Sequence, residues 1–237
     1  MPQRSPGLVS SFHSVQRASR FHIMTRADAL FRSSSPHALG RKGRETRQRL
    51  VDAAALLLTS TSPIDLTAMA IAAEAGTASA TFYVYFRDVQ DILYALSEAA
   101  TEDMLAAFSK LDIFRSNARV AEDSEAFLKM LAEQWERHNA VLYYRMMEAD
   151  RGDPRFTKLR GRWAEAVLSR FWELLKRAPH LEPPLDETDA YAESIVLFAS
   201  IERLAAAVHR EPRLTISAQR IRAAQARILT RMIAPQG

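Results

Sequence analysis

Small and hydroxyl-bearing side chains are concentrated in one short stretch, residues 67–86, which reads TAMAIAAEAGTASATFYVYF. Apolar residues in its first half recur on one helical face. Gly76 stands where a helix can end in the left-handed conformation that only glycine adopts without penalty. Phe82 and Phe86, four residues apart, would share one face of a second short helix. Two short helices around a tight turn form a helix-turn-helix, whose second helix can enter the major groove of DNA.

This segment resembles the helix-turn-helix of the TetR family of bacterial transcriptional regulators. The residues that match at the family's spacing are Thr67, Ile71-Ala72, Ala75-Gly76, Thr81-Phe82-Tyr83 and Tyr85-Phe86. The alternative is an ordinary helical hairpin in an all-α protein, since Ala-rich hairpins are common.

The resemblance implies which residues contact DNA. Ser79, Ala80, Thr81 and Tyr83 match positions that face bases or line the groove. Positions that hold phosphates match Thr67, Tyr85 and the start of the first helix. Packing within the head is the alternative for the two tyrosines. The full predicted set is Arg44, Thr67, Ala78, Ser79, Ala80, Thr81, Tyr83, Tyr85 and Arg87.

The predicted reading helix departs from the family's pattern. Family members often carry Ser and then Lys where Ala78 and Ser79 stand, and Lys where Val89 stands. No Arg, Lys, Asn or Gln lies between Gly76 and Phe86, so the strong bidentate contacts with guanine and adenine are absent from this helix. We therefore expect phosphate contacts and DNA shape to carry more of the binding, with Arg41, Lys42, Arg44, Arg47 and Arg87 as phosphate clamps.

Charge is unevenly distributed along the chain. Residues 1–44 hold eight Lys or Arg and a single acid, Asp28, which gives this segment a charge of +7. Because the whole chain carries +4, the remainder carries −3. The positive charge thus lies beside the predicted DNA-binding element, as attraction to phosphate requires. With no cysteine and no apolar run near the ~20 residues of a membrane span, we expect a cytoplasmic protein, nucleoid-associated when bound.

The sequence predicts three segments. Residues 1–40, rich in Ser, Arg, His and Pro, are expected to be a disordered basic extension, or in part to precede a true start at Met24. Residues 41–87 form a DNA-binding domain, and residues 88–237 form a domain for effector binding and dimerisation. The fold class is all-α, with a three-helix helix-turn-helix head joined to a six-helix C-terminal body. Helices are expected near 44–59, 67–75, 78–85, 88–110, 122–137, 139–149, 154–178, 187–209 and 217–233.

The body is rich in aromatic and methionine side chains, which suit an adaptable apolar cavity. Residues of these types at helical spacing are also common in plain cores, and that alternative stays open. A small apolar effector is predicted from this composition. Its pocket is assigned to Met104, Phe108, Trp135, Met147, Trp163, Phe171 and Phe198.

The predicted helix 187–209 is apolar on nearly all faces, which indicates burial on more than one side. The predicted helix 217–233 carries an apolar stripe. The family resemblance implies that they form a four-helix bundle across a two-fold axis, so a homodimer is expected. A central core helix in a monomer is the alternative. The interface is assigned to Phe198, Leu204, Ile221 and Ile228.

The sequence also lacks two common metal-binding patterns. Neither Glu-x-x-His pairs nor His-Glu-x-x-His occurs, and the six histidines are far apart in sequence. We therefore expect no enzyme activity, cofactor, metal or membrane partner. The expected partners are a palindromic double-stranded DNA operator, a small-molecule effector and a second copy of the chain, with repression as the expected mode of regulation. The competing hypothesis is a helical interaction module with a vestigial helix-turn-helix and no effector.

Overall fold

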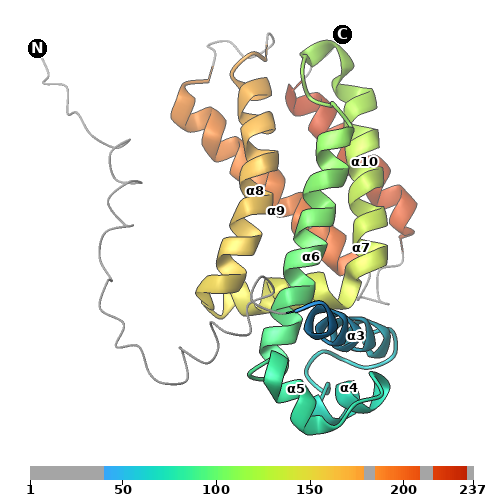
Figure 1. Cartoon of the computed structure of the whole chain (residues 1–237). Helices are drawn as coiled ribbons and strands as arrows, with labels where there is room; N and C mark the ends of the chain where they lie inside the picture. Colours follow the sequence, from blue (N-terminus) through green and yellow to red (C-terminus); the bar gives the residue numbers. More distant parts are fainter. Residues whose placement is uncertain (1–39, 179–184, 209–215, 234–237) are drawn as a thin grey trace, which may run out of the picture. The chain divides into compact units, whose positions relative to one another are not determined.

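The computed structural model describes residues 40–178, 185–208 and 216–233, which form helices and connecting loops without a strand in those ranges (Figure 1). The all-α prediction is confirmed. The predicted disordered extension, apart from Gly40, and the proline-containing breaks at 179–184 and 211–212 lie outside the described residues.

The first helices are α3 (Arg41–Leu57), α4 (Ala68–Glu74), α5 (Ser79–Tyr85) and α6 (Val89–Lys110). A short 3-10 helix, η2 (Asn117–Arg119), then leads into α7 (Val120–Asp150). The remaining helices are α8 (Pro154–Leu175), α9 (Glu187–Val208) and α10 (Ala218–Ile233). Within these ranges, no helix is both long and apolar enough to cross a membrane.

The chain divides into two compact units, residues 1–47 and 48–237. Helix α3 begins in the first unit and continues into the second, where Leu50, Ala53 and Ala54 are buried. The predicted functional boundary between residues 87 and 88 remains a proposal.

Side chains at the helix starts explain where several helices begin. The Oγ1 of Thr67 accepts a 3.1 Å hydrogen bond from the amide of Ala70, which makes Thr67 the N-cap of α4. Asp88 caps α6 by accepting a 2.8 Å bond from the amide of Asp91. At α8, the carboxylate of Asp153 caps the helix and Pro154 occupies the first turn, where its missing N–H costs nothing.

Helix α7 contains a break in helical geometry at His138, whose φ and ψ are −119° and 16°. The predicted break between 137 and 139 is therefore confirmed, although the two halves follow one another directly. The Nε2 of His138 lies 3.2 Å from the Oδ2 of Asp103 on α6. Burial lowers the pKa of His138 and outweighs the attraction of Asp103 for its proton.

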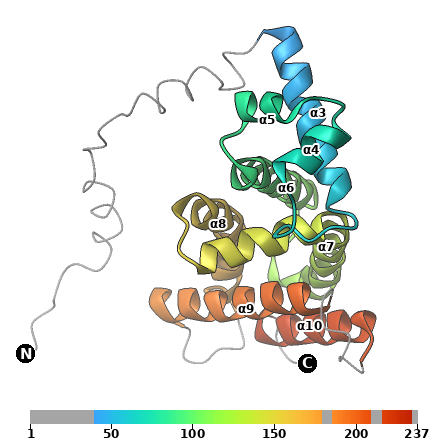
Figure 2. The same cartoon turned by 90° about the horizontal axis from the view of Figure 1, so that it is seen from below.

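The core of the larger unit lies where α6, α7 and α8 run beside one another (Figure 1). Phe127 of α7 is fully buried, with its ring centroid 5.7 Å from Phe108, 6.5 Å from Trp163 and 5.8 Å from Phe171. Helices α9 and α10 lie next to each other along one edge of these three helices (Figure 2). This arrangement leaves one side of the α9–α10 layer facing away from the core.

Replacing Gly76, whose φ is +65°, with alanine should lower the free energy of unfolding by about 1–2 kcal/mol, because a Cβ disfavours the left-handed conformation. The matched control is Gly161→Ala in the interior of α8, where the added methyl meets nothing within 4 Å. That change should stabilise the protein by roughly 0.5–1 kcal/mol, because alanine favours helix. Urea denaturation measures both. Equal effects of the two substitutions would contradict this account of the turn.

Candidate nucleic-acid interface

The turn between α4 and α5 is built by backbone hydrogen bonds around Gly76. The amide of Thr77 bonds to the carbonyl of Ala72 at 2.9 Å, and the amide of Gly76 bonds to Ala73 at 3.1 Å. This pair of bonds is the Schellman arrangement, which needs a residue with positive φ between helix end and exit. The short helix that follows is thus held at a defined angle to α4.

Helix α5 has one buried face and one open face. Phe82 and Phe86 are almost fully buried, and their ring centroids lie 5.7 Å apart. On the open face, the side chains of Tyr83 and Val84 are 60% and 62% exposed. Since the two phenylalanines anchor the helix, its other side is free to meet a partner.

The predicted DNA contacts differ in their surroundings. Ala78, Ser79, Ala80 and Tyr83 are exposed, while Thr81 and Tyr85 are half-buried. Thr67 is exposed, and its hydroxyl can still donate to a phosphate while its oxygen caps α4. Arg44 is exposed in the smaller unit, residues 1–47.

Two exposed apolar residues near this face were not among the predicted contacts. Val84 lies on α5, and Met69 of α4 is 71% exposed. Their exposure was not evident from the sequence, because helical spacing alone would place an apolar residue in the core. Their methyl groups suit contact with the methyl of thymine.

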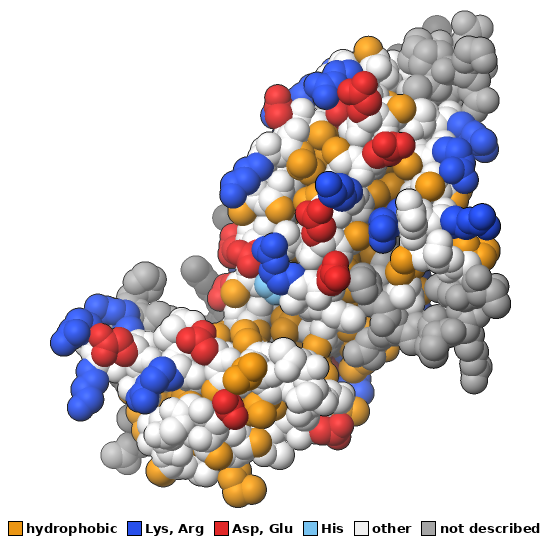
Figure 3. All heavy atoms as spheres, turned by 90° about the vertical axis from the view of Figure 1, so that its right-hand side faces the viewer, with side chains coloured by type: hydrophobic (Ala, Val, Ile, Leu, Met, Phe, Trp, Pro, Cys, Tyr) orange, Lys and Arg blue, Asp and Glu red, His pale blue; other side chains and the backbone are white. Residues whose placement is uncertain are grey.

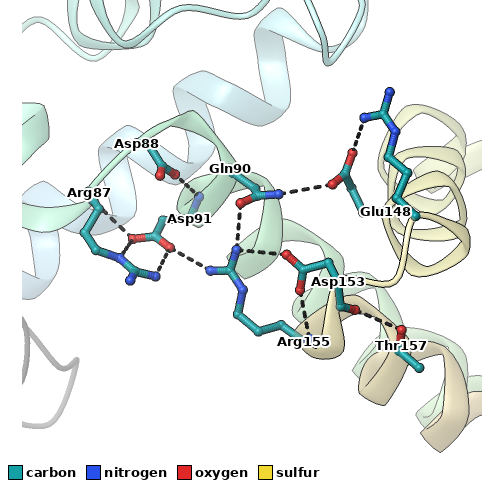
Figure 4. A network of polar contacts seen from close by, with 9 residues as sticks. Arg87, Asp88, Gln90, Asp91, Glu148, Asp153, Arg155 and Thr157 are labelled. Carbon is teal, nitrogen blue, oxygen red and sulfur yellow. Dashed lines mark hydrogen bonds and ion pairs between the residues drawn. The ribbon is translucent and has the colours of Figure 1, made fainter. Parts of the chain in front are cut away.

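Arg87, directly after α5, enters an ion-pair network centred on the carboxylate of Asp91 (Figure 4). The Nε and Nη2 of Arg87 donate to the two oxygens of Asp91 at 2.7 and 2.6 Å. The Nη1 of Arg155, on α8, donates to Oδ1 of the same carboxylate at 2.9 Å. The side chain of Asp91 is only 7% exposed. The chain that leaves α5 is therefore tied to α6 and to α8.

The network continues through amide and carboxylate side chains (Figure 4). Gln90 accepts a 2.8 Å bond from Arg155 and donates a 3.1 Å bond to Glu148 near the end of α7. Glu148 in turn accepts a 2.8 Å bond from Arg151. Helices α6, α7 and α8 are thus joined close to the point where the chain leaves α5.

The pKa of Asp91 reflects two opposing effects. Burial alone would raise it, but the hydrogen bonds and positive charges of Arg87 and then Arg155 together lower it below the ordinary value for aspartate. Because the folded-state pKa is depressed, the resulting stability is present above the unfolded pKa and is lost as the pH falls through the folded pKa.

Surface charge elsewhere is mixed. On the face drawn in Figure 3, basic and acidic side chains alternate with hydrophobic ones over the upper part of the molecule. This part of the surface therefore offers no broad patch of one sign that would attract nucleic acid by charge alone.

The sequence matches no protein-family model and no curated protein. Solved structures do match. A TetR-family member from Streptomyces coelicolor is 20% identical over 81% of this chain and 99% of its own, with a TM-score of 0.58. The fatty acid degradation regulator FadR from Bacillus halodurans is 15% identical over 81% and 96%, with a TM-score of 0.60. The chain has the TetR-family fold.

A further structure with the TetR fold is FadR from Bacillus subtilis, which was solved with stearoyl-CoA. It is 14% identical to this chain, covers 78% of it and 98% of its own length, and has a TM-score of 0.54. The Bacillus subtilis protein is described as a transcriptional regulator, and the Bacillus halodurans protein as a regulator of fatty acid degradation.

Within this TetR fold, the residues predicted to line an effector pocket are mostly fully packed. Apart from the half-buried Met147, all of them are buried, and three, Phe108, Trp163 and Phe171, belong to the aromatic core around Phe127. One of them, Phe108, also lines a cavity of about 560 Å³ between α6 and α8, together with Leu105, Ile113 and Ala166. Their assignment to a pocket remains a prediction.

The residues predicted to form the dimer interface differ in how far they are exposed to solvent. Phe198 is buried within the chain, Ile221 is half-buried, and Leu204 and Ile228 are exposed, Ile228 by 52%. Tyr191, Ile195 and Val196 of α9 are exposed as well. Large apolar side chains of both α9 and α10 are therefore exposed to solvent, as residues of a subunit interface would be.

Replacing Asp91 with asparagine should lower the free energy of unfolding at pH 7 by roughly 1–3 kcal/mol, because two guanidinium groups lose the negative charge and one acceptor oxygen of the carboxylate that they share. It should also reduce the loss of stability that the unmodified protein shows as the pH falls below about 4, because the pKa of Asp91 is depressed in the folded state. Denaturation at several pH values measures both effects.

The control for this prediction is Glu102→Gln, a change on the same helix as Asp91 that breaks the exposed pair of Glu102 with Arg162 of α8. That change should alter stability by no more than about 0.5 kcal/mol. If Asp91→Asn were as mild as the control, the network would have no role in holding α5.

Proposed function

We propose that the chain is a sequence-specific DNA-binding transcriptional regulator. The observation that carries the proposal is the two-sided character of α5, with Phe82 and Phe86 buried and Ser79, Ala80 and Tyr83 open to solvent. A short helix anchored in this way after a tight turn can insert its open face into the major groove. Its TetR-family fold, shared with solved transcriptional regulators, supports the same function.

Recognition of the DNA bases relies on hydroxyl and methyl groups of α5. The hydroxyls of Ser79, Thr81 and Tyr83 can bond to base edges, and the methyls of Ala80 and Val84 can contact thymine. These contacts discriminate less than bidentate arginine or asparagine contacts would. Thr67 and the basic residues of the first turns of α3, which include Arg44, add affinity through phosphates.

A homodimer supports this mode of binding. The exposed apolar side chains on the outer side of α9 and α10 would be covered by the same surface of a second copy, as in an isologous interface. A two-fold dimer presents two copies of α5, and its operator would be palindromic.

The body is proposed to bind a small apolar effector that lowers operator affinity, so that the free protein represses. The concentration of buried aromatic and methionine side chains between α6, α7 and α8 supports this role. FadR from Bacillus subtilis, which has the same fold, was solved with a ligand that carries a long acyl chain. An effector acts only by binding one of two conformations more tightly than the other.

A helical interaction module with a vestigial helix-turn-helix is the second candidate. It is favoured by one observation, the absence of Arg, Lys, Asn and Gln between Gly76 and Phe86. Protection of a discrete site near the chain's own gene in a footprinting experiment would exclude it.

Replacing Tyr83 with alanine should weaken binding to such a site by about 1–3 kcal/mol without lowering the melting temperature, since the side chain is exposed. Tyr83→Phe removes the hydroxyl alone and separates its hydrogen bond from ring contacts. Lys158→Ala, an exposed change on α8, is the control and should leave affinity unchanged. Unchanged affinity of Tyr83→Ala in a mobility-shift titration would argue against α5 as the reading helix.

Replacing Leu204 or Ile228 with arginine should produce monomers that bind DNA roughly tenfold or more weakly, because linked half-sites no longer reinforce each other. Analytical ultracentrifugation measures the mass. Ser169→Arg, an exposed position on α8, should remain dimeric. A monodisperse monomer of the unmodified protein would overturn the interface.

A further inference from the structure

An arginine is enclosed in the interior of the larger unit. Arg145 of α7 has a side chain that is 1% exposed, and it lies against residues of two neighbouring helices. Its Nη1 donates a 2.9 Å hydrogen bond to the Oγ1 of Thr101 and lies 4.0 Å from the sulfur of Met104, both on α6. Charged side chains are almost never buried unless they are paired.

The pairing of this guanidinium is incomplete. Its Nη2 lies 3.8 Å from the Oε1 of Glu202 on α9, which is an ion pair at the limit of contact and too long for a hydrogen bond. Its Nε has no hydrogen-bond partner among the described residues, and neither has the Oε1 of Glu202. Burial lowers the pKa of Arg145 to about 10, so the group remains charged at neutral pH.

Glu202 forms its hydrogen-bonded ion pair with a different arginine. Its Oε2 accepts bonds of 3.0 and 2.9 Å from the Nε and Nη2 of Arg160 on α8. Arg160 also donates a 2.8 Å bond to Asp150. The carboxylate of Glu202 therefore pairs mainly with Arg160. The guanidinium of Arg145 keeps its buried positive charge, and its Nε has no acceptor among the described residues.

A purely structural ion pair would be expected to satisfy its buried donors, since leaving them unmade is costly. Here the Nε of Arg145 is instead left without an acceptor among the described residues, and the nearest carboxylate oxygen, Oε1 of Glu202, is too far from the guanidinium for a hydrogen bond. Thr101 and Met104 of α6, Arg145 of α7 and Glu202 of α9 meet there, and Met104 is also one of the residues predicted to line the effector pocket. Its unbranched thioether side chain can change rotamer to admit a ligand.

We propose that Arg145 is the anchor for the carboxylate of an amphiphilic effector, whose apolar chain lies among the side chains beside Met104. The proposal rests on the proposed effector-binding role of the body and replaces a wholly apolar effector with an acidic one. The planar fork of the guanidinium matches the two oxygens of a carboxylate. A ligand held there would contact α6 directly.

The test compares three probes with the same ten-carbon chain, namely decanoate, decanol and decylammonium, by calorimetry on the full chain without DNA. Decanoate should bind roughly tenfold or more tightly than either of the others, as expected for a charge-assisted bidentate contact. In Arg145→Gln this preference should fall to about one. Arg162→Gln, which removes an exposed arginine of α8, should keep it.

A second variant separates an anchoring role from a structural one. Glu202→Gln removes the competing carboxylate and should tighten decanoate binding while leaving decanol unchanged. Equal affinities of the unmodified protein for decanoate and decanol would overturn the proposal, and this comparison needs no variant to fold. Because no DNA is present, that result would leave the DNA-binding function to its own test.

Discussion

The ion pairs of Arg87 and Arg155 with the carboxylate of Asp91 connect the chain that follows α5 to helices α6 and α8. Arg87, which follows α5, and Arg155, which begins α8, both donate to this carboxylate, and its burial makes the loss of either bond costly. The position of α5 is consequently set by two constraints. The buried phenylalanines hold it from within the head, and the ion pairs hold the chain that leaves it.

Helix α6 carries both the carboxylate that holds the chain after α5 and the hydroxyl that contacts Arg145. Asp91 lies in its first turn, and Thr101, the partner of Arg145, lies ten residues further along. At a rise of 1.5 Å per residue, these positions are about 15 Å apart on one rigid element. An effector that displaces Thr101 would therefore move the helix that bears Asp91, with no need for a longer path through the protein. Such a shift alters DNA affinity only if the effector prefers one position of α6.

Local features of the fold were predictable because they depend on nearby residues. Gly76 at the turn and Thr67 at the start of α4 are explained by residue type and helical spacing, and the structure has both in these roles. The break between the helices expected at 122–137 and 139–149 is also present, at His138. The polar networks were not predictable. Asp91 and Arg155 are 64 residues apart, and helical periodicity does not say which charged side chains meet across helices. The one available signal for Arg145 was its place between large apolar neighbours in YYRMM, where a solvated arginine is unexpected.

Two copies of α5 are proposed to read a defined DNA sequence, and the test is selection of bound sequences from a random double-stranded DNA library. The full chain should enrich an inverted repeat whose half-sites lie one helical turn or a multiple of it apart, and the enrichment should persist at physiological salt. Thymine should be common at the contacted positions, given the methyl and hydroxyl side chains of α5. Binding that disappears as salt rises, with no enriched sequence, would contradict the account.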